Sequence, residues 1–158
     1  DRFGVFYLEA SQDGLNLSLN EAISWCTNQQ ADWIIILPAD IPLLRACDIN
    51  KIIELGINGS SAVLVPSADN GTNTLFQSVP VFIDPCFGPR SFRKHSKLIF
   101  SKGIDARFYG SLNVICDIDS ADDLKKVLSI KNNTLCREAL EQIINHNKTA
   151  RDFFNVDD

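Results

Sequence analysis

Hydrophobic and polar positions along the chain predict strands and helices in alternation. The run Trp33–Leu37 is apolar on both faces of a pleat, which is typical of a central strand in a parallel sheet. Residues 62–65 have the same character and predict a second buried strand. Shorter or less regular strands are predicted over 3–8, 74–87 and 114–116.

Helical periodicity fills the segments between these strands. Ser18 and Glu21 have the spacing of a capping box, which predicts that a helix starts there, and Ser120 predicts the start of another. Gly56 follows a periodic segment and is expected to act as its C-terminal cap. The predicted helices cover residues 18–29, 48–55, 91–102, 121–129 and 135–144.

This alternation predicts a three-layer α/β fold with a mainly parallel sheet. The length of 158 residues and the lack of low-complexity linkers predict a single domain over 1–158, with a helical tail over about 133–158. No apolar run approaches the roughly 20 residues of a membrane helix. Five widely spaced cysteines favour reduced thiols, so we expect a cytoplasmic protein with no membrane partner.

The charge of the chain limits its partners. The formal net charge is −5 and no basic patch occurs, so we expect no nucleic-acid partner, whose phosphates would require positive charge. Small anions stay compatible with an acidic protein, because a few oriented amides or a metal ion can bind them.

Acidic residues follow two of the predicted strands, where ligands of open α/β sheets bind. Asp40 lies between Pro38 and Pro42, which stiffen the backbone. Asp117 and Asp119 alternate along a strand and are expected to face the same side. The three carboxylates could converge on Mg²⁺, or they could be solvated turn and cap residues, and the pattern leaves both readings open.

Two further segments have the composition of an anion site. Gly88 to Ser91 is glycine, proline, arginine and a serine that opens a helix, which fits either an anion-binding helix start or an ordinary cap. The segment Asn70–Asn73 follows a buried strand and fits a turn or a ligand loop. His95 is interpreted as a packing or substrate-adjacent residue and not as a catalytic base.

These motifs occur in an order that resembles the 2-phospho-L-lactate guanylyltransferase family. The matching segments are Gly14-Leu15-Asn16, Leu37-Pro38-Ala39-Asp40-Ile41-Pro42-Leu43, Gly71-Thr72-Asn73-Thr74-Leu75, Phe87-Gly88-x-x-Ser91-Phe92-x-x-His95 and Asp117-Ile118-Asp119-x-x-x-Asp123-Leu124. The resemblance covers about residues 14–124. Ala-Asp-x-Pro is shared by many nucleotidyltransferases, whereas the Gly-Thr-Asn and Phe-Gly-x-x-Ser-Phe-x-x-His motifs are more specific.

The resemblance implies a Rossmann-like nucleotidyltransferase fold of the GT-A type. It implies an enzyme of coenzyme F-420 biosynthesis that transfers GMP from GTP to 2-phospho-L-lactate, phosphoenolpyruvate or 3-phosphoglycerate and releases pyrophosphate. The implied cofactor is Mg²⁺, and the implied partners are GTP and the phosphorylated acid. The implied roles are metal binding and catalysis for Asp40, Asp117 and Asp119, acid binding for Thr72, Asn73, Gly88 and Ser91, and nucleotide binding for Gly14, Leu15, Asn16 and Pro66.

The chain also departs from the family pattern. The family begins with a strand and a Lys/Arg-bearing loop that cradles the GTP phosphates, whereas this sequence starts at Asp1 and contains no methionine. We therefore expect a chain that lacks its first strand and nucleotide loop. Two alternatives stay open: another small-molecule nucleotidyltransferase of this fold, and a non-catalytic binding or regulatory domain. A homodimer formed through the last helix is also left open.

Overall fold

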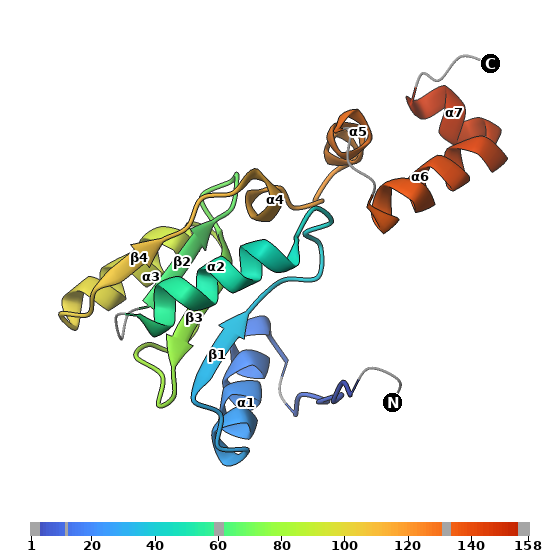
Figure 1. Ribbon diagram of the computed structural model, residues 1–158. Helices are drawn as coiled ribbons and strands as arrows, with labels where there is room; N and C mark the ends of the chain where they lie inside the picture. The colour runs from blue at the N-terminus through green and yellow to red at the C-terminus, as the bar shows by residue number, and fades with distance from the viewer. Residues whose placement is uncertain (1–3, 12, 59–61, 131–133, 155–158) are drawn as a thin grey trace.

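The computed structural model describes residues 4–11, 13–58, 62–130 and 134–154 (Figure 1). Its strands are β1 (Trp33–Ile36), β2 (Ala62–Pro66), β3 (Thr72–Ser78) and β4 (Ala106–Phe108). Its helices are α1 (Leu15–Asn28), α2 (Ala46–Ile57), α3 (Ser91–Ser101), α4 (Leu112–Ile115), α5 (Ala121–Ser129), α6 (Leu135–His146) and α7 (Lys148–Phe154). In this described part, no helix is both long enough and apolar enough to cross a membrane.

The four strands form one mixed sheet in the order β1-β3-β2-β4. β3 is antiparallel to both β1 and β2, and β4 is parallel to β2. Three strands therefore run in one direction, and β3 runs against them between β1 and β2. Two of the three pairings are antiparallel, so the sheet is mixed and not mainly parallel in its pairing as predicted. β1, which was predicted to be a central strand, lies at the edge of the described sheet. The antiparallel β2–β3 pair arises because only a short loop, residues 67–71, joins the two strands, whereas parallel neighbours need a long crossover.

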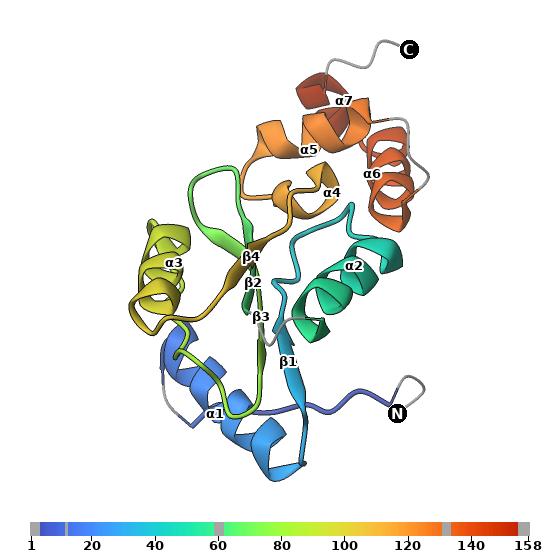
Figure 2. The ribbon, with the colours of Figure 1, turned by 60° about the vertical axis from the view of Figure 1, so that its left-hand side comes forward.

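The sheet is buried on both faces, which gives three layers (Figure 2). Along β2, Val63 and Val65 belong to a core cluster with Ile52 of α2. The alternate residue Leu64 belongs to a second cluster with Ile99 of α3. The period of two along the strand thus sends successive side chains into opposite layers. The predicted three-layer α/β architecture is confirmed.

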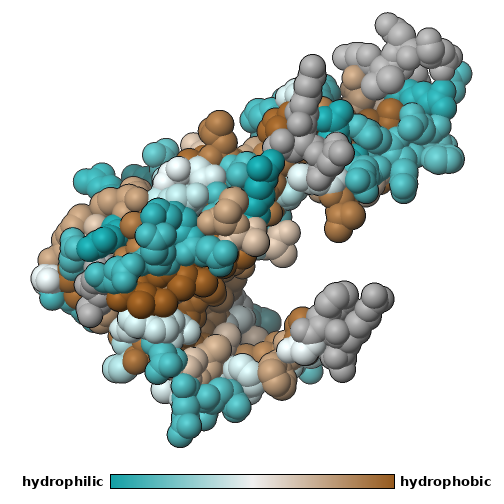
Figure 3. All heavy atoms as spheres, viewed as in Figure 1, coloured by the Kyte–Doolittle hydropathy of each residue, from teal (hydrophilic) through white to brown (hydrophobic). Residues whose placement is uncertain are grey.

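Helices α5, α6 and α7 lie together beyond one end of the sheet (Figure 1). Their surface is mostly hydrophilic in the view of Figure 3. α5 begins after Ser120, whose backbone N–H and hydroxyl both donate to the Asp123 carboxylate, at 2.9 and 2.6 Å. The predicted start at Ser120 is therefore confirmed. α7 lies within the predicted helical tail, although it was not predicted as a separate helix, and the three-residue strand β4 was not predicted.

Two predicted strands are wrong, and a third, over 74–87, is too long, because β3 ends at Ser78. Residues 114–116 were expected to be a strand, but residues 112–115 form the one-turn helix α4. Ser111 closes this turn, because its carbonyl accepts from the N–H groups of Val114 and Ile115 at 3.0 and 2.9 Å. An apolar run this short fits a buried strand or a buried turn equally well. Of the expected strand over 3–8, residues 4–8 are described and have no strand structure.

Two predicted helix boundaries are also wrong. α1 begins at Leu15, one turn before the predicted capping box, so Ser18 lies within the helix and its hydroxyl donates to the Gly14 carbonyl at 3.1 Å. The Glu21 carboxylate instead accepts from Ser11. Gly56 lies inside α2, where a Cβ would be 1.9 Å from the Phe76 ring. The glycine is required by close packing of α2 on β3, and not by a helix end.

Candidate functional site

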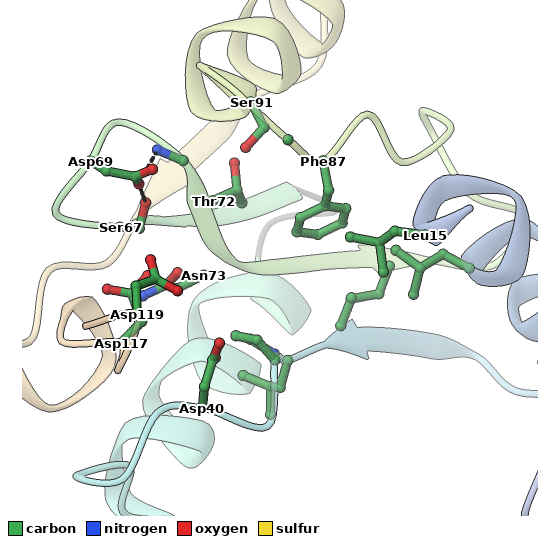
Figure 4. Close-up of a pocket in the computed structure, with 16 residues that line it drawn as sticks. Leu15, Asp40, Ser67, Asp69, Thr72, Asn73, Phe87, Ser91, Asp117 and Asp119 are labelled. Atoms are coloured by element: carbon green, nitrogen blue, oxygen red, sulfur yellow. Dashed lines mark hydrogen bonds between the residues drawn. The ribbon is translucent and has the colours of Figure 1, made fainter. Parts of the chain in front are cut away.

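A pocket of about 340 Å³ opens at the edge of the sheet where β1 and β2 end and β3 begins (Figure 4). This is the position at which α/β sheets bind ligands. Sixteen residues line it: Leu15, Leu19, Ile36, Leu37, Pro38, Asp40, Ser67, Asp69, Gly71, Thr72, Asn73, Phe87, Gly88, Ser91, Asp117 and Asp119. The three predicted metal-binding acids and the four predicted acid-binding residues are all among them.

The backbone brings the predicted acids together from distant segments. Asp40 follows β1, and its carbonyl accepts a hydrogen bond of 3.0 Å from the N–H of Ile118. Ile118 lies between Asp117 and Asp119, so this single bond joins the two acidic segments. The segment 116–119 is not part of a strand, yet both of its carboxylates line the pocket.

A buried carboxylate outside the pocket positions α4, the helix that leads into the acidic segment. Asp48 of α2 accepts hydrogen bonds from Tyr109, Ser111 and Asn113 at 2.8, 2.7 and 3.2 Å, and from the Arg45 N–H at 3.2 Å. Burial raises the pKa of Asp48, but these hydrogen bonds outweigh it and hold the pKa below its ordinary value. An ionised Asp48 therefore connects α2 to the start of α4.

Asn73 fixes the other end of α4. Its amide nitrogen donates to the carbonyls of Val114 and Ile115, at 2.8 and 3.2 Å. The side chain is almost fully buried, although it contributes to the pocket wall. The amide nitrogen of Asn73, which was predicted to bind the phosphorylated acid, is therefore engaged with α4.

The acidic side of the pocket contains a fourth carboxylate, Asp69, which was not predicted from the sequence. Hydrogen bonds from the Ser67 hydroxyl and from the Gly71 N–H, the latter at 2.9 Å, lower the pKa of Asp69. A serine, an aspartate and a glycine at this spacing are typical of a turn in which the aspartate accepts backbone hydrogen bonds. This pattern is the sequence signal that could have identified Asp69.

Burial and the neighbouring carboxylates make Asp117 harder to ionise. Burial raises the pKa of Asp117, and the negative charges of Asp119, Asp69 and Asp40 raise it further. None of the described residues that line the pocket is Lys, Arg or His, so the wall itself supplies no cation to balance these charges.

The acids do not form a closed metal cage. Across the described ranges, no three Asp, Glu, His or Cys side chains are close enough together to hold one metal ion. Mg²⁺ nevertheless fits this donor set, because it binds through one or two carboxylates and fills its remaining positions with water and phosphate oxygens.

Two hydroxyl groups, those of Thr72 and Ser91, lie on the side of the pocket opposite Asp117 and Asp119 and point toward each other (Figure 4). Thr72 is the first residue of β3, and Ser91 is the first residue of α3; both are buried. The Ser91 N–H is engaged with the Gly88 carbonyl at 3.0 Å, which leaves the hydroxyl to face the pocket. Gly88 has a φ of 113°, a conformation that favours glycine, and its backbone forms part of the wall.

His95 lies behind this hydroxyl side and is fully buried. Its Nδ1 is 2.9 Å from the Thr72 hydroxyl, and its Nε2 accepts from the Cys86 N–H at 2.9 Å. The Phe87 ring meets the imidazole edge-on, with ring centroids 5.0 Å apart. Burial, followed by the positive charge of Lys94, lowers the pKa of His95 to about 4, so the ring is neutral at pH 7.

The predicted nucleotide-binding residues are only partly at the pocket. Leu15 lines it, whereas Gly14, Asn16 and Pro66 are not among the lining residues. The Asn16 side-chain amide donates to the Phe87 carbonyl at 3.1 Å and accepts from the Phe87 N–H at 2.7 Å. Asn16 thereby holds α1 against the segment that precedes α3. Its predicted role toward the nucleotide stays a prediction.

Comparisons with known proteins agree with the resemblance seen in the motifs. The phosphoenolpyruvate guanylyltransferase of Rubrobacter xylanophilus is 34% identical over 115 residues, which cover 72% of this chain and 56% of that protein. The 2-phospho-L-lactate guanylyltransferase of Methanosphaera stadtmanae is 31% identical over 127 residues, which cover 80% and 54%. The chain therefore spans about half the length of the curated relatives it matches.

A solved structure shares the fold. It is described as a nucleotide-diphospho-sugar transferase from Desulfovibrio desulfuricans G20, and it superposes with a TM-score of 0.73 at 13% identity. The match covers 91% of this chain and 64% of that one, which shows the likeness of fold alone. A family model described as "Guanylyl transferase CofC like" matches residues 1–155. The chain thus belongs to the CofC-like guanylyl transferase family.

Proposed function

We propose that the protein transfers GMP from GTP to a small phosphorylated acid and releases pyrophosphate, as a step in coenzyme F-420 biosynthesis. Family membership supports the transfer, and the relatives' names support phosphoenolpyruvate or 2-phospho-L-lactate as the acid. The observation that carries the proposal is the two-sided pocket, which has carboxylates on one side and hydroxyl donors on the other (Figure 4).

The hydroxyl side suits the phosphorylated acid. Thr72 and Ser91 offer neutral donors to carboxylate or phosphate oxygens, and Ser91 stands at the N-terminus of an 11-residue helix, whose dipole favours an anion. Phe87 and Leu15 add apolar wall beside them. These groups support a small anionic ligand with an apolar part, as a phosphorylated acid would be.

The carboxylate side suits Mg²⁺, which one or two of Asp40, Asp117 and Asp119 would hold, with water and phosphate oxygens in its remaining positions. When bound, the ion would neutralise charge on the phosphate groups and on the departing pyrophosphate. Burial and, after it, the neighbouring carboxylates raise the pKa of Asp117, so a bound cation would favour its ionised form.

The reaction needs no protein base. A phosphate monoester has a second pKa near ~6, so the acid's phosphate is already ionised at neutral pH. One of its oxygens attacks the α-phosphorus of GTP, a new P–O–P linkage forms, and the bond to the β-phosphate breaks with its electron pair leaving on pyrophosphate. Thr72 and Ser91 would bind the acid in the pocket and so bring it beside the nucleotide.

Pyrophosphate release tests the proposal. The full-length protein is mixed with GTP, Mg²⁺ and, in turn, 2-phospho-L-lactate, phosphoenolpyruvate or 3-phosphoglycerate. We expect release that depends on one of these acids and is absent when the acid is omitted. A folded protein that releases no pyrophosphate with any of them would overturn the proposal and favour a non-catalytic binding domain.

A further inference from the structure

His95 is a buried polar residue that the proposed reaction does not use as a base. It is not among the residues that line the pocket, and both of its ring nitrogens are engaged within the protein. Buried polar atoms are normally hydrogen-bonded, so the partner of each nitrogen decides what the ring can do for its neighbours.

The partners of the two nitrogens fix the tautomer. A backbone N–H is always a donor, so the Cys86 N–H requires a lone pair at Nε2, 2.9 Å away. The proton of the neutral ring must then be at Nδ1. Nδ1 therefore donates to the Thr72 hydroxyl oxygen across 2.9 Å.

This donation decides what Thr72 offers to the pocket. Its oxygen accepts from His95, so its own O–H must point elsewhere, and Thr72 borders the pocket opposite the acids. Figure 4 shows the Thr72 and Ser91 hydroxyls directed toward the same part of the pocket. We infer that His95 is a positioning residue that presents the Thr72 hydroxyl as a donor to an anionic oxygen of the phosphorylated acid. This inference rests on the proposed function.

If the role of His95 were purely structural, a different one of its two hydrogen bonds would matter. In that case the hydrogen bond from Cys86 matters, because it anchors the segment before α3, and the bond to Thr72 is incidental. The two roles use different ring nitrogens, so conservative substitutions can separate them.

Two variants retain one hydrogen bond each. An Asn amide nitrogen sits on the γ-carbon, as Nδ1 does, so His95→Asn keeps the donor to Thr72 and loses the acceptor for Cys86. A Gln amide is one bond longer and reaches the Nε2 position, so His95→Gln keeps the acceptor and loses the donor. Thr72→Val removes the hydroxyl, and Thr72→Ser retains it.

Steady-state kinetics of the full-length protein with phosphoenolpyruvate and GTP test the inference. We expect KM for phosphoenolpyruvate to rise about ten- to a hundredfold in Thr72→Val and roughly two- to tenfold in His95→Gln, with kcat little changed. His95→Asn should raise KM less than His95→Gln does, and Thr72→Ser less than Thr72→Val does, because each of the two keeps the donor arrangement.

Nitrogen-15 NMR of the wild-type protein tests the tautomer without any variant. We expect a protonated Nδ1 and an unprotonated Nε2. The reverse assignment would overturn the inference, as would a KM in His95→Asn raised as much as in His95→Gln. A wild-type protein that uses none of the three acids would overturn the proposed function itself, and this control distinguishes the two failures.

Discussion

Asp40 and Asp119 line one pocket from segments far apart in the chain. Replacement of either residue by Asn preserves its size and removes the negative charge that would bind Mg²⁺. We expect GTP-dependent pyrophosphate release to fall about a hundredfold or more in Asp40→Asn and Asp119→Asn, with little change in unfolding temperature.

Asp105→Asn is the matched control, because Asp105 lies outside the pocket and its side chain is 72% exposed. It should release pyrophosphate at the wild-type rate. If Asp40→Asn and Asp119→Asn also keep that rate, the carboxylate side of the pocket has no part in the reaction.

His95 makes the stability of the fold depend on pH. The pKa of the folded protein's His95 is about 4, below the ordinary value of 6.5, so protonation favours the unfolded chain. The stability that neutral His95 contributes to the fold is fully present above pH 6.5. It is lost as the pH falls toward 4, which lowers the free energy of unfolding by about 3 kcal/mol in all.

Urea unfolding of wild type and His95→Gln at several pH values measures this effect. The free energy of unfolding of wild type should exceed that of the variant at pH 7.5, and this difference should shrink by about 3 kcal/mol by pH 4. If the difference in free energy of unfolding stays constant over this range, His95 titrates normally in the folded protein.

Individual site residues were predictable where they stood in a motif after a strand. Asp40 and Thr72 follow predicted strands, Ser91 opens a predicted helix, and all three line the pocket. Asp69 was not selected. Its turn is held by a local hydrogen bond with Gly71, but its proximity to Asp117 depends on the whole fold and has no local sequence signal. The bond that joins Asp40 to Ile118 could not be inferred from either segment alone.

At the scale of elements, Asp48 connects α2 to α4. One carboxylate oxygen accepts from Tyr109 and Ser111, and the other accepts from Arg45 and Asn113. In Asp48→Asn an NH₂ group meets one of these donor pairs, so we expect a loss of about 2 to 3 kcal/mol in the free energy of unfolding.

Chemical unfolding measures this loss, and Tyr109→Phe is the graded comparison. It removes one donor and leaves the carboxylate three others, so it should cost about 1 kcal/mol. An Asp48→Asn protein as stable as wild type would contradict a structural role for this carboxylate.

The packing of α2 on β3 depends on Gly56. A Cβ there would overlap the Phe76 ring, 1.9 Å from its nearest carbon, so Gly56→Ala should destabilise the protein by about 1 to 3 kcal/mol despite the better helix propensity of alanine. At Gly110 an alanine methyl group would meet no atom within 4 Å, so Gly110→Ala should change the unfolding midpoint little.

The same glycine shows why some elements were predicted and others were not. Gly56 resembled a helix end in the sequence, and only the contact with β3 shows that the helix continues. β2, α3 and α5 have strong local signals and were predicted nearly to their ends. α4 was mistaken for a strand, because its turn depends on Ser111 and on contacts with Asp48 and Asn73.

At the scale of the whole molecule, the fold brings carboxylate and hydroxyl side chains to one edge of the sheet. β1 and β2 deliver acids at their ends, while β3 and α3 begin there with Thr72 and Ser91. Because β3 is antiparallel to β1 and β2, its first residue lies at the edge of the sheet where those two strands end. This arrangement predicts one site for both halves of the reaction, with nucleotide phosphates near the acids and the phosphorylated acid near the hydroxyls.

The most direct test of the proposed reaction is to identify the bond that the full-length protein forms. Phosphoenolpyruvate with oxygen-18 in its phosphate would be supplied with GTP and Mg²⁺, or 2-phospho-L-lactate if that acid supports release. Phosphorus NMR and mass spectrometry would then follow the products. We expect pyrophosphate and a guanosine diphosphate diester whose bridging oxygen comes from the labelled acid. GMP and pyrophosphate without the diester, or no reaction in a folded protein, would contradict the proposed transfer.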